Sequence, residues 1–293
     1  MFPFCTDPAA LPQWQWFACY LTSGTHLAFY WSFVVVIILV VLAAPASLLL
    51  GFAGAVALRS RYAVLRWLGQ GYTAMVRGVP DVVFFLFVPI AVDQTLEYLM
   101  HQVRCPHWEG PVRRGNDFVV CAQAKLPSSS AAAWVHDVYA FALALLAFAL
   151  VFGAFAAHTL SGAMRAVPKA QTETAEAFGM TRGQAFRRVL MPQMWIYALP
   201  GLSNLWMILI KATPLLFLLG IQDIVYWARE LGGSKTAFYT YPHPDWRLWY
   251  FLAVLVFYLA LTWVSERGFS RLMDRMSVGQ DTAGGERLRR ARA

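Results

Sequence analysis

Long apolar runs alternate with short polar segments along most of the chain. Five of these runs approach or exceed the roughly 20 mostly apolar residues that a membrane-spanning helix needs. They cover residues 27–58, 71–92, 138–159, 193–210 and 248–264. The pattern predicts five spans, with Lys211 and Pro214 disturbing the end of the fourth.

A polar, basic segment between the third and fourth runs has the pattern of two short helices joined by a turn. Pro168 suits the first position of a helix, and Gly179 suits the left-handed residue that ends one. Thr181 and Gln184 have the spacing of a capping box, so a second helix is expected to begin there. Pro192 is expected to end this helical hairpin.

Each helix of the hairpin has an apolar side. In the first helix this side holds Ala170, Ala175, Ala177 and Phe178; in the second it holds Ala185, Phe186, Val189 and Leu190, opposite Arg182, Arg187 and Arg188. Periodicity alone leaves two interpretations open: an amphipathic segment in the lipid headgroup layer, or a docking surface for a soluble partner.

Composition places the chain in a bilayer. Hydrophobic residues make up 59% of the 293 residues and charged residues only 14%, with a mean hydropathy of +0.50. This is too apolar for a soluble domain of that length. The net charge of +8 is interpreted as a sign of membrane topology and attraction to anionic lipid, not of nucleic-acid binding.

The hairpin also carries a family signature. Glu173-Thr174-Ala175, followed by Gly179 and Met191-Pro192, resembles the Glu-Ala-Ala, Gly and Leu-Pro signature of the coupling helices in permease subunits of ABC importers. Thr174 stands where the family has Ala, and Met191 where it has Leu. Both changes are small in volume or polarity.

The similarity continues outside the hairpin. It includes the flanking segments AVPKAQ and ALPGLSNLWMILIKATPL, and QGYTAMVRGVPDVV at residues 70–83. Its specific part covers residues 70–90 and 162–235, less than half of the chain. These segments are similar to the polar-amino-acid branch of the family, and most closely to the Q-type permease subunits of histidine/lysine/arginine/ornithine importers.

The resemblance implies an all-α integral membrane protein: five transmembrane helices in the type I ABC importer permease fold, with a cytoplasmic coupling hairpin. It implies that the hairpin contacts an ABC ATPase, through Glu173, Ala175, Gly179, Arg182 and Pro192. The ATPase subunits would bind ATP and Mg, so no cofactor is expected in this chain. The other implied partners are a second homologous permease chain, forming a heterodimer, and a periplasmic amino-acid-binding protein.

The motifs of common enzyme sites are missing from the sequence. The segment GGSKT at residues 232–236 contains Lys-Thr but lacks the spacing of a P-loop, and neither HExxH nor GxSxG occurs. His158 and Ser161, about one helical turn apart, are interpreted as a polar contact at a helix interface. We expect no catalytic residue, metal ligand or nucleotide site, so ATP hydrolysis is assigned to a separate subunit.

Basic residues are distributed unequally between the segments that join the spans. If the first connection, the hairpin region and the tail lie in the cytoplasm, that side holds fifteen Lys and Arg residues and the other side seven. The positive-inside rule then places the chain in a bacterial inner membrane with its N-terminus periplasmic and its C-terminus cytoplasmic. No basic residue precedes the first apolar run, so a cleaved signal peptide is not expected.

This topology gives three parts: a periplasmic N-terminal segment (1–26), a transmembrane permease domain (27–266) and a cytoplasmic basic tail (267–293). The permease domain includes a periplasmic insert (93–135) and the cytoplasmic coupling hairpin (168–192). The insert either contacts a binding protein or is a lineage-specific loop. The last residues of the tail are expected to be disordered, with their arginines near anionic lipid.

All four cysteines fall on the predicted periplasmic side, where disulfides form. Four cysteines allow three pairings. Local pairing, Cys105 with Cys121 and Cys5 with Cys19, closes the smallest loops and is preferred. The alternative is that all four are free thiols.

Asp81 is the deepest carboxylate in the predicted spans. It lies ten residues into the second apolar run, about 15 Å from its start and near the middle of a bilayer core of roughly 30 Å. A charge there usually faces a cavity or a partner. Asp81 is therefore a candidate substrate-binding residue, while Arg77, four residues earlier, could pair with it structurally, orient it for a cationic substrate, or do both.

The sequence thus predicts the permease subunit of an ATP-driven ABC importer for polar, cationic amino acids. One alternative is a permease of the same branch that carries another polar amino acid or an opine. Another is a non-transporting membrane scaffold or sensor whose hairpin recruits a soluble partner.

Overall fold

The computed structural model describes residues 5, 11–110, 113–114, 117–118 and 120–276. Five helical segments in this part of the chain are long and apolar enough to cross a membrane. They are Gly24–Leu58, Asp81–Arg104, Ala133–Ala166, Arg182–Leu219 and Arg247–Met276. The prediction of five transmembrane helices in an all-α fold is confirmed, although most of the helix ends differ from those of the apolar runs.

The chain separates into two compact units. Unit 1 contains residues 1–46, 76–151 and 212–257, and unit 2 contains residues 47–75, 152–211 and 258–293. Helices α2 (Gly24–Leu58), α5 (Ala133–Ala166) and α10 (Arg247–Met276) each contribute one part to unit 1 and another to unit 2.

The other elements fall mainly within one unit. Unit 1 holds α1 (Gln13–Leu21), α4 (Asp81–Arg104), β1 (Arg113–Arg114), β2 (Asp117–Phe118), the 3-10 helices η2 (Ala122–Ala124) and η4 (Thr213–Leu219), and α9 (Ile224–Gly232). Unit 2 holds most of α3 (Ala63–Gly78), then α6 (Lys169–Ala177), α7 (Arg182–Ala185), the π-helical turn η3 (Phe186–Leu190) and α8 (Met191–Ala212).

The second apolar run does not form one helix, so the prediction of a continuous span over residues 71–92 is wrong. Helix α3 ends at Gly78, and α4 begins at Asp81 after Pro80. Proline lacks the backbone N–H that a helix interior requires, and it disfavours helical backbone in the residue before it. The span is α4 itself, which continues past Val92 to Arg104.

Two of the predicted polar segments contain parts of the neighbouring helices. Residues 93–104 of the predicted insert belong to α4, so the segment between α4 and α5 covers only residues 105–132. Helix α10 extends to Met276, so the first ten residues of the predicted tail are helical, and the rest lie outside the described residues.

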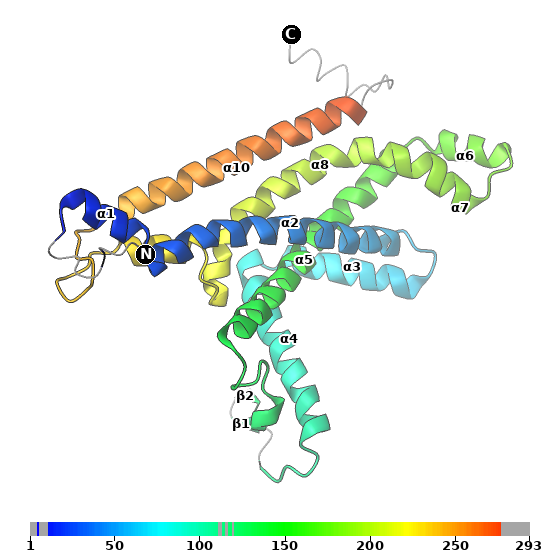
Figure 1. The fold of residues 1–293 in the computed structure, drawn as a ribbon. Coiled ribbons are helices and arrows are strands. Elements are labelled where there is room, and N and C mark those ends of the chain that lie inside the picture. The colour runs from blue at the N-terminus through cyan, green and yellow to red at the C-terminus, as the bar shows by residue number, and fades with distance from the viewer. Residues whose placement is uncertain (1–4, 6–10, 111–112, 115–116, 119, 277–293) are drawn as a thin grey trace. The chain divides into compact units, whose positions relative to one another are not determined.

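The remaining insert is fastened to the C-terminal half of α4. Cys105 and Cys121 form a disulfide, and the backbone N–H of Cys121 donates to Nδ1 of the buried His101 at 3.0 Å. Arg104 donates to the carbonyl of Gln123 at 2.8 Å. Strands β1 and β2 pair antiparallel within this segment (Figure 1).

In unit 2, glycines let helix backbones approach closely. A Cβ built on Gly51 of α2 would lie 2.5 Å from Cβ of Ala156 in α5, and one built on Gly201 of α8 would lie 2.6 Å from Cγ2 of Thr159. Small residues at helix contacts are typical of membrane proteins, where close backbone packing stabilises association.

Candidate functional site

The turn of the hairpin has the hydrogen bonds of a complete helix C-cap. Gly179 adopts φ +85°, its N–H donates to the carbonyl of Glu176 at 2.9 Å, and the N–H of Met180 donates to the carbonyl of Ala175 at 3.1 Å. These two bonds make a Schellman motif, which satisfies carbonyls that the end of α6 would otherwise leave open. The left-handed conformation predicted for Gly179 is confirmed. Pro168 is the N-cap residue of α6 rather than its first helical residue.

The second helix begins with the predicted capping box. The N–H of Thr181 donates to Oε1 of Gln184 at 2.9 Å, and the N–H of Gln184 donates to Oγ1 of Thr181 at 3.3 Å. Because helix caps at both sides of the turn are satisfied locally, the hairpin does not need a partner to hold its shape.

Pro192 does not end the hairpin, contrary to the prediction. Helix α7 passes through the π-helical turn η3 into α8, whose second residue is Pro192. Proline has no N–H for the carbonyl four residues earlier, Arg188, and its ring crowds that carbonyl. The wider turn, in which Met191 N–H donates to the carbonyl of Phe186, gives that proline room. The second helix of the hairpin is therefore continuous with the fourth span.

The base of the hairpin is anchored in the core of unit 2. Buried side chains from α2, α5, the residue after α5, η3 and α8 form one cluster, which comprises Ala55, Leu160, Ala163, Met164, Val167, Leu190, Met194 and Ala198. Ala185 of α7 is also buried, as its place on the apolar face predicted. This cluster joins the hairpin to the membrane helices through packed side chains.

The signature residues of the hairpin differ in exposure. Glu173, Gly179, Arg182 and Pro192 are exposed, whereas Ala175 is buried. The hydroxyl of Thr174, which stands where the family has Ala, donates to the carbonyl of Ala170 at 2.7 Å, so the additional polar group has a partner.

Phe178 corrects the predicted apolar side of α6. Its side chain is 84% exposed, because it is the C-cap residue next to Gly179 and the chain leaves the helix there. An aromatic ring at the tip of a polar hairpin is suited to a contact with another protein. Periodicity placed Phe178 on the apolar side of the helix, whereas its position directly before the glycine of a C-cap was the signal for exposure.

Arg77 and Asp81 lie on opposite sides of the break between α3 and α4. Arg77 is in the last turn of α3 and exposed, and Asp81 is the first residue of α4 and partly buried. The interruption removes the four-residue helical spacing on which an Arg77–Asp81 pair was predicted. It also removes the depth estimate for Asp81, which assumed one helix from Gly71. A carboxylate at a helix N-terminus is favoured by the helix dipole.

Among the described residues, one group of three metal-ligating side chains is close together: His101, Cys105 and Cys121 have ligand atoms within 4.8 Å of one another. The two sulfurs are bonded to each other, so neither is a thiolate, and Nδ1 of His101 already accepts a backbone hydrogen bond. In this oxidised form the group is a disulfide with a supporting histidine.

Unit 1 also contains a buried carboxylate that was not among the predicted site residues. Asp223 is fully buried and caps α9 by accepting from the N–H of Tyr226 at 2.9 Å, while its Oδ2 has no hydrogen-bond partner among the described residues. Burial raises the pKa of Asp223 to about 6, although the N–H groups at the start of α9 oppose the shift. Its position before an apolar, helix-forming segment signalled an N-cap but not burial.

The five spans and the capped hairpin define an integral-membrane permease. The chain belongs to the binding-protein-dependent transport system inner membrane component family, whose model matches residues 47–278. This match includes the hairpin and leaves α1 outside it.

Two relatives and one solved structure refine this assignment. The chain is 33% identical over 234 residues to the histidine/lysine/arginine/ornithine transport system permease protein HisQ of Salmonella typhimurium, covering 80% of this chain and 86% of that one. It is 28% identical over 213 residues to the arginine ABC transporter permease protein ArtQ of Escherichia coli, covering 73% and 79%. The predicted membership of the ABC importer permeases is confirmed.

The fold matches the crystal structure of an amino acid ABC transporter with histidines. The match has a TM-score of 0.60 and covers 90% of this chain and 99% of the other. Identity is only 18%, so this likeness supports the fold alone.

Proposed function

We propose that this chain is the permease subunit of an ATP-driven importer that carries cationic amino acids from the periplasm to the cytoplasm. The observation that carries the proposal is the hairpin, which is capped at its turn and continuous with the fourth span. A force applied to the tip of such a hairpin can be transmitted to a membrane helix. The names of the two relatives supply the substrate class.

The ATPase contact is assigned to the exposed part of the hairpin. Glu173 and Arg182 offer charges of opposite sign on α6 and α7, and Phe178, which lies between them in sequence, offers an exposed apolar ring. Gly179 and Ala175 shape the turn through the Schellman motif and are given a positioning role. Pro192 belongs to the joint with α8, so we assign it to transmission of movement rather than to the contact surface.

ATP and Mg would be bound by partner ATPase subunits. This division fits a chain whose sequence lacks a P-loop and whose charged hairpin is suited to meet a soluble protein. The remaining subunits would be a second homologous permease chain and a periplasmic binding protein that delivers the substrate. The hairpin and the C-terminus would face the cytoplasm, and the N-terminus the periplasm, as the excess of basic residues indicates.

Asp81 and Arg77 are proposed to contact the substrate at the interruption between α3 and α4. Broken helices in transporters expose backbone groups and helix ends that can bind ions and zwitterions. The N-terminus of α4 and the Arg77 guanidinium would attract the α-carboxylate, and the Asp81 carboxylate would attract a side-chain ammonium or guanidinium.

Reconstitution tests the proposed function. The permease, its ATPase and its partner permease would be placed in vesicles, and ATP hydrolysis and arginine uptake measured with and without the loaded binding protein. Both should rise when the loaded protein is added. Co-purification with an ATPase but no uptake of any ligand would instead favour a scaffold or sensor. Native mass spectrometry of the ligand held by the binding protein would separate cationic amino acids from other polar amino acids and opines.

A further inference from the structure

The outward face of α1 is apolar. Trp14 is 69% exposed, Phe17 46% and Leu21 45%, and their spacing of three and four residues places them on one side of the helix. A helix on a water-facing surface normally carries polar or charged side chains there. None of the nine residues of α1 is charged.

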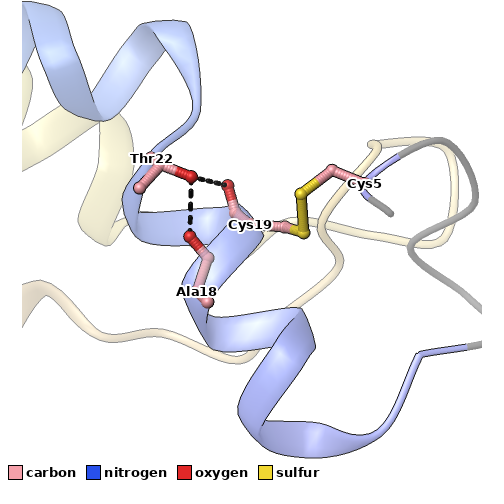
Figure 2. The surroundings of a disulfide bond; sticks show 4 residues. All are labelled: Cys5, Ala18, Cys19 and Thr22. Atoms are coloured by element: carbon pink, nitrogen blue, oxygen red, sulfur yellow. Dashed lines mark hydrogen bonds between the residues drawn. A yellow bond between two sulfur atoms is a disulfide. The ribbon is translucent and has the colours of Figure 1, made fainter. Parts of the chain in front are cut away.

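The opposite face of α1 is fixed to the rest of unit 1. Cys19 is bonded to Cys5, and the hydroxyl of the buried Tyr20 is 3.1 Å from Nε2 of His243 and 2.9 Å from the hydroxyl of Tyr250 (Figure 2 shows the disulfide). The ring of Trp16 packs edge-on against Trp246. The helix is therefore held in place. The ring of Phe17 also stacks on Trp246, but about half of its surface stays exposed, as does that of Leu21.

Helix α1 is joined to the first membrane span by a very short connection. Only Thr22 and Ser23 separate α1 from α2, and the hydroxyl of Thr22 donates to the carbonyl of Ala18 at 2.7 Å, which closes the end of α1 (Figure 2). Tyr20 also bonds Tyr250, near the start of the span α10. These links keep α1 close to the ends of two spans, where lipid headgroups begin.

Charge and aromatic content favour lipid over a protein partner. The sequence from Pro8 to Leu58 contains no Asp, Glu, Lys or Arg, whereas protein interfaces have a polar rim. Trp31 and Trp249, near the starts of α2 and α10, are 62% and 66% exposed. Tryptophan is enriched at membrane–water interfaces, where its ring is apolar and its N–H is hydrated.

We propose that α1 is an interfacial helix whose Trp14, Phe17 and Leu21 face inserts into the phospholipid leaflet on the N-terminal side of the membrane. It would fix the level at which α2 enters the bilayer and hold the loop before α10 beside it. The proposal requires only that the chain spans a membrane and does not depend on the substrate.

Fluorescence quenching by lipid tests the insertion. The four natural cysteines are paired in two disulfides, so a single added cysteine can be labelled with bimane in the intact permease complex. The variants are Trp14→Cys and, as a second position, Leu21→Cys, with the exposed polar position Ser129→Cys as the control. The complex would be placed in phosphatidylethanolamine–phosphatidylglycerol vesicles with and without brominated acyl chains.

Brominated lipid should quench bimane at positions 14 and 21 at least about threefold more strongly than at position 129. Quenching at both α1 positions equal to that at 129 would overturn the proposal. It would also be overturned if these labels escaped lipid quenching but changed emission on adding the loaded binding protein, because α1 would then be a protein-docking face.

Discussion

Gly179 is the residue on which the shape of the hairpin depends most directly. Its φ of +85° is left-handed, while a Cβ added there would meet no atom within 4 Å. A substitution at this position therefore tests backbone strain without a steric clash. A β-branched residue tolerates this conformation poorly, and the cost is about 1–2 kcal/mol.

We expect Gly179→Val to assemble normally and to lose transport or uncouple ATP hydrolysis from it. Gly179→Asn is the matched control, since asparagine enters the left-handed region more readily, and it should retain most activity. Uptake and ATPase rates, each normalised to the amount of assembled complex, are the measurements. Wild-type uptake by the valine variant would contradict the role of the hairpin in coupling.

Asp81 tests substrate selection at the break between α3 and α4. Asp81→Asn keeps the volume and some hydrogen bonding but removes the charge that would attract an ammonium or guanidinium group. Arginine uptake should fall by about tenfold or more, the effect of losing one charge-assisted hydrogen bond, while assembly and basal ATPase activity are retained.

Arg77→Gln is the companion variant for this test. Loss of the complex from the membrane in both variants would show a purely structural pair. Unchanged arginine uptake by Asp81→Asn would show that the carboxylate does not select the substrate.

Asp223 should make the stability of the chain depend on pH. Its pKa is about 6 in the folded chain, against an ordinary value of 3.8. The unfolded chain therefore ionises this carboxyl more readily, so its contribution to folding is greatest below pH 3.8 and is lost as pH rises through 6. The difference at neutral pH amounts to about 3 kcal/mol.

Asp223→Asn should raise the unfolding midpoint at pH 7.5 and reduce the gain in stability that the wild type shows between pH 7.5 and 5. Asparagine is an equally good helix N-cap, so the cap to Tyr226 is retained. The same substitution at Asp245 is the control, because that carboxylate is exposed and Arg247 holds its pKa below the ordinary value. A lower midpoint for Asp223→Asn at pH 7.5 would contradict the argument.

At the scale of elements, the hairpin was predictable because its signals are local. A left-handed glycine and a capping box each depend on residues within one or two turns, and both are present as expected. The path after the hairpin was not predictable in this way. Pro192 normally ends or kinks a helix, but the π-helical turn before it and the packed cluster at its base let the helix continue.

The break before Asp81 was missed although its signal is also local. Hydropathy counts apolar residues and is insensitive to backbone continuity, so it merged α3 and α4 into one span although Pro80 signalled an interruption. The cluster around Tyr20 was missed for another reason. Tyr20 packs with Tyr241 and Trp246, which are far from it in sequence. The burial of Asp223 likewise depends on packing that its neighbours in sequence do not specify.

The insert is an element whose order should depend on its disulfide. The bond between Cys105 and Cys121 joins residues that are 16 positions apart. Removing it should raise the conformational entropy of the unfolded segment, which lowers the stability of the folded insert by about 3 kcal/mol. In Cys105→Ser/Cys121→Ser, amide exchange should rise across residues 105–132 and hardly change in α10.

Peptide mapping without reductant should recover the linked pair of Cys105 and Cys121 from wild type. Free, alkylatable thiols at both positions in wild-type protein from an oxidising periplasm would contradict the assignment.

At the scale of the whole molecule, the orientation in the membrane is the open prediction. Reporters that are active only in the periplasm, fused after Ser129 or Lys235, should be active, and those fused after Gly183 or Met276 silent. The reason is the excess of basic residues on the side of the hairpin and the tail. An active reporter at Gly183 would place the hairpin where no ATPase can reach it.

The close glycine contacts of unit 2 have a mechanical consequence. Long side chains between helices can change rotamer and so absorb small movements, but α2 and α5 come almost backbone to backbone at Gly51, and the side chain of Thr159 in α5 packs directly on Gly201 of α8. Little slack separates these helices. A movement imposed on the hairpin would therefore displace these helices as a rigid body. The residues that set the spacing of the helices would then also determine how completely the movement reaches the membrane spans.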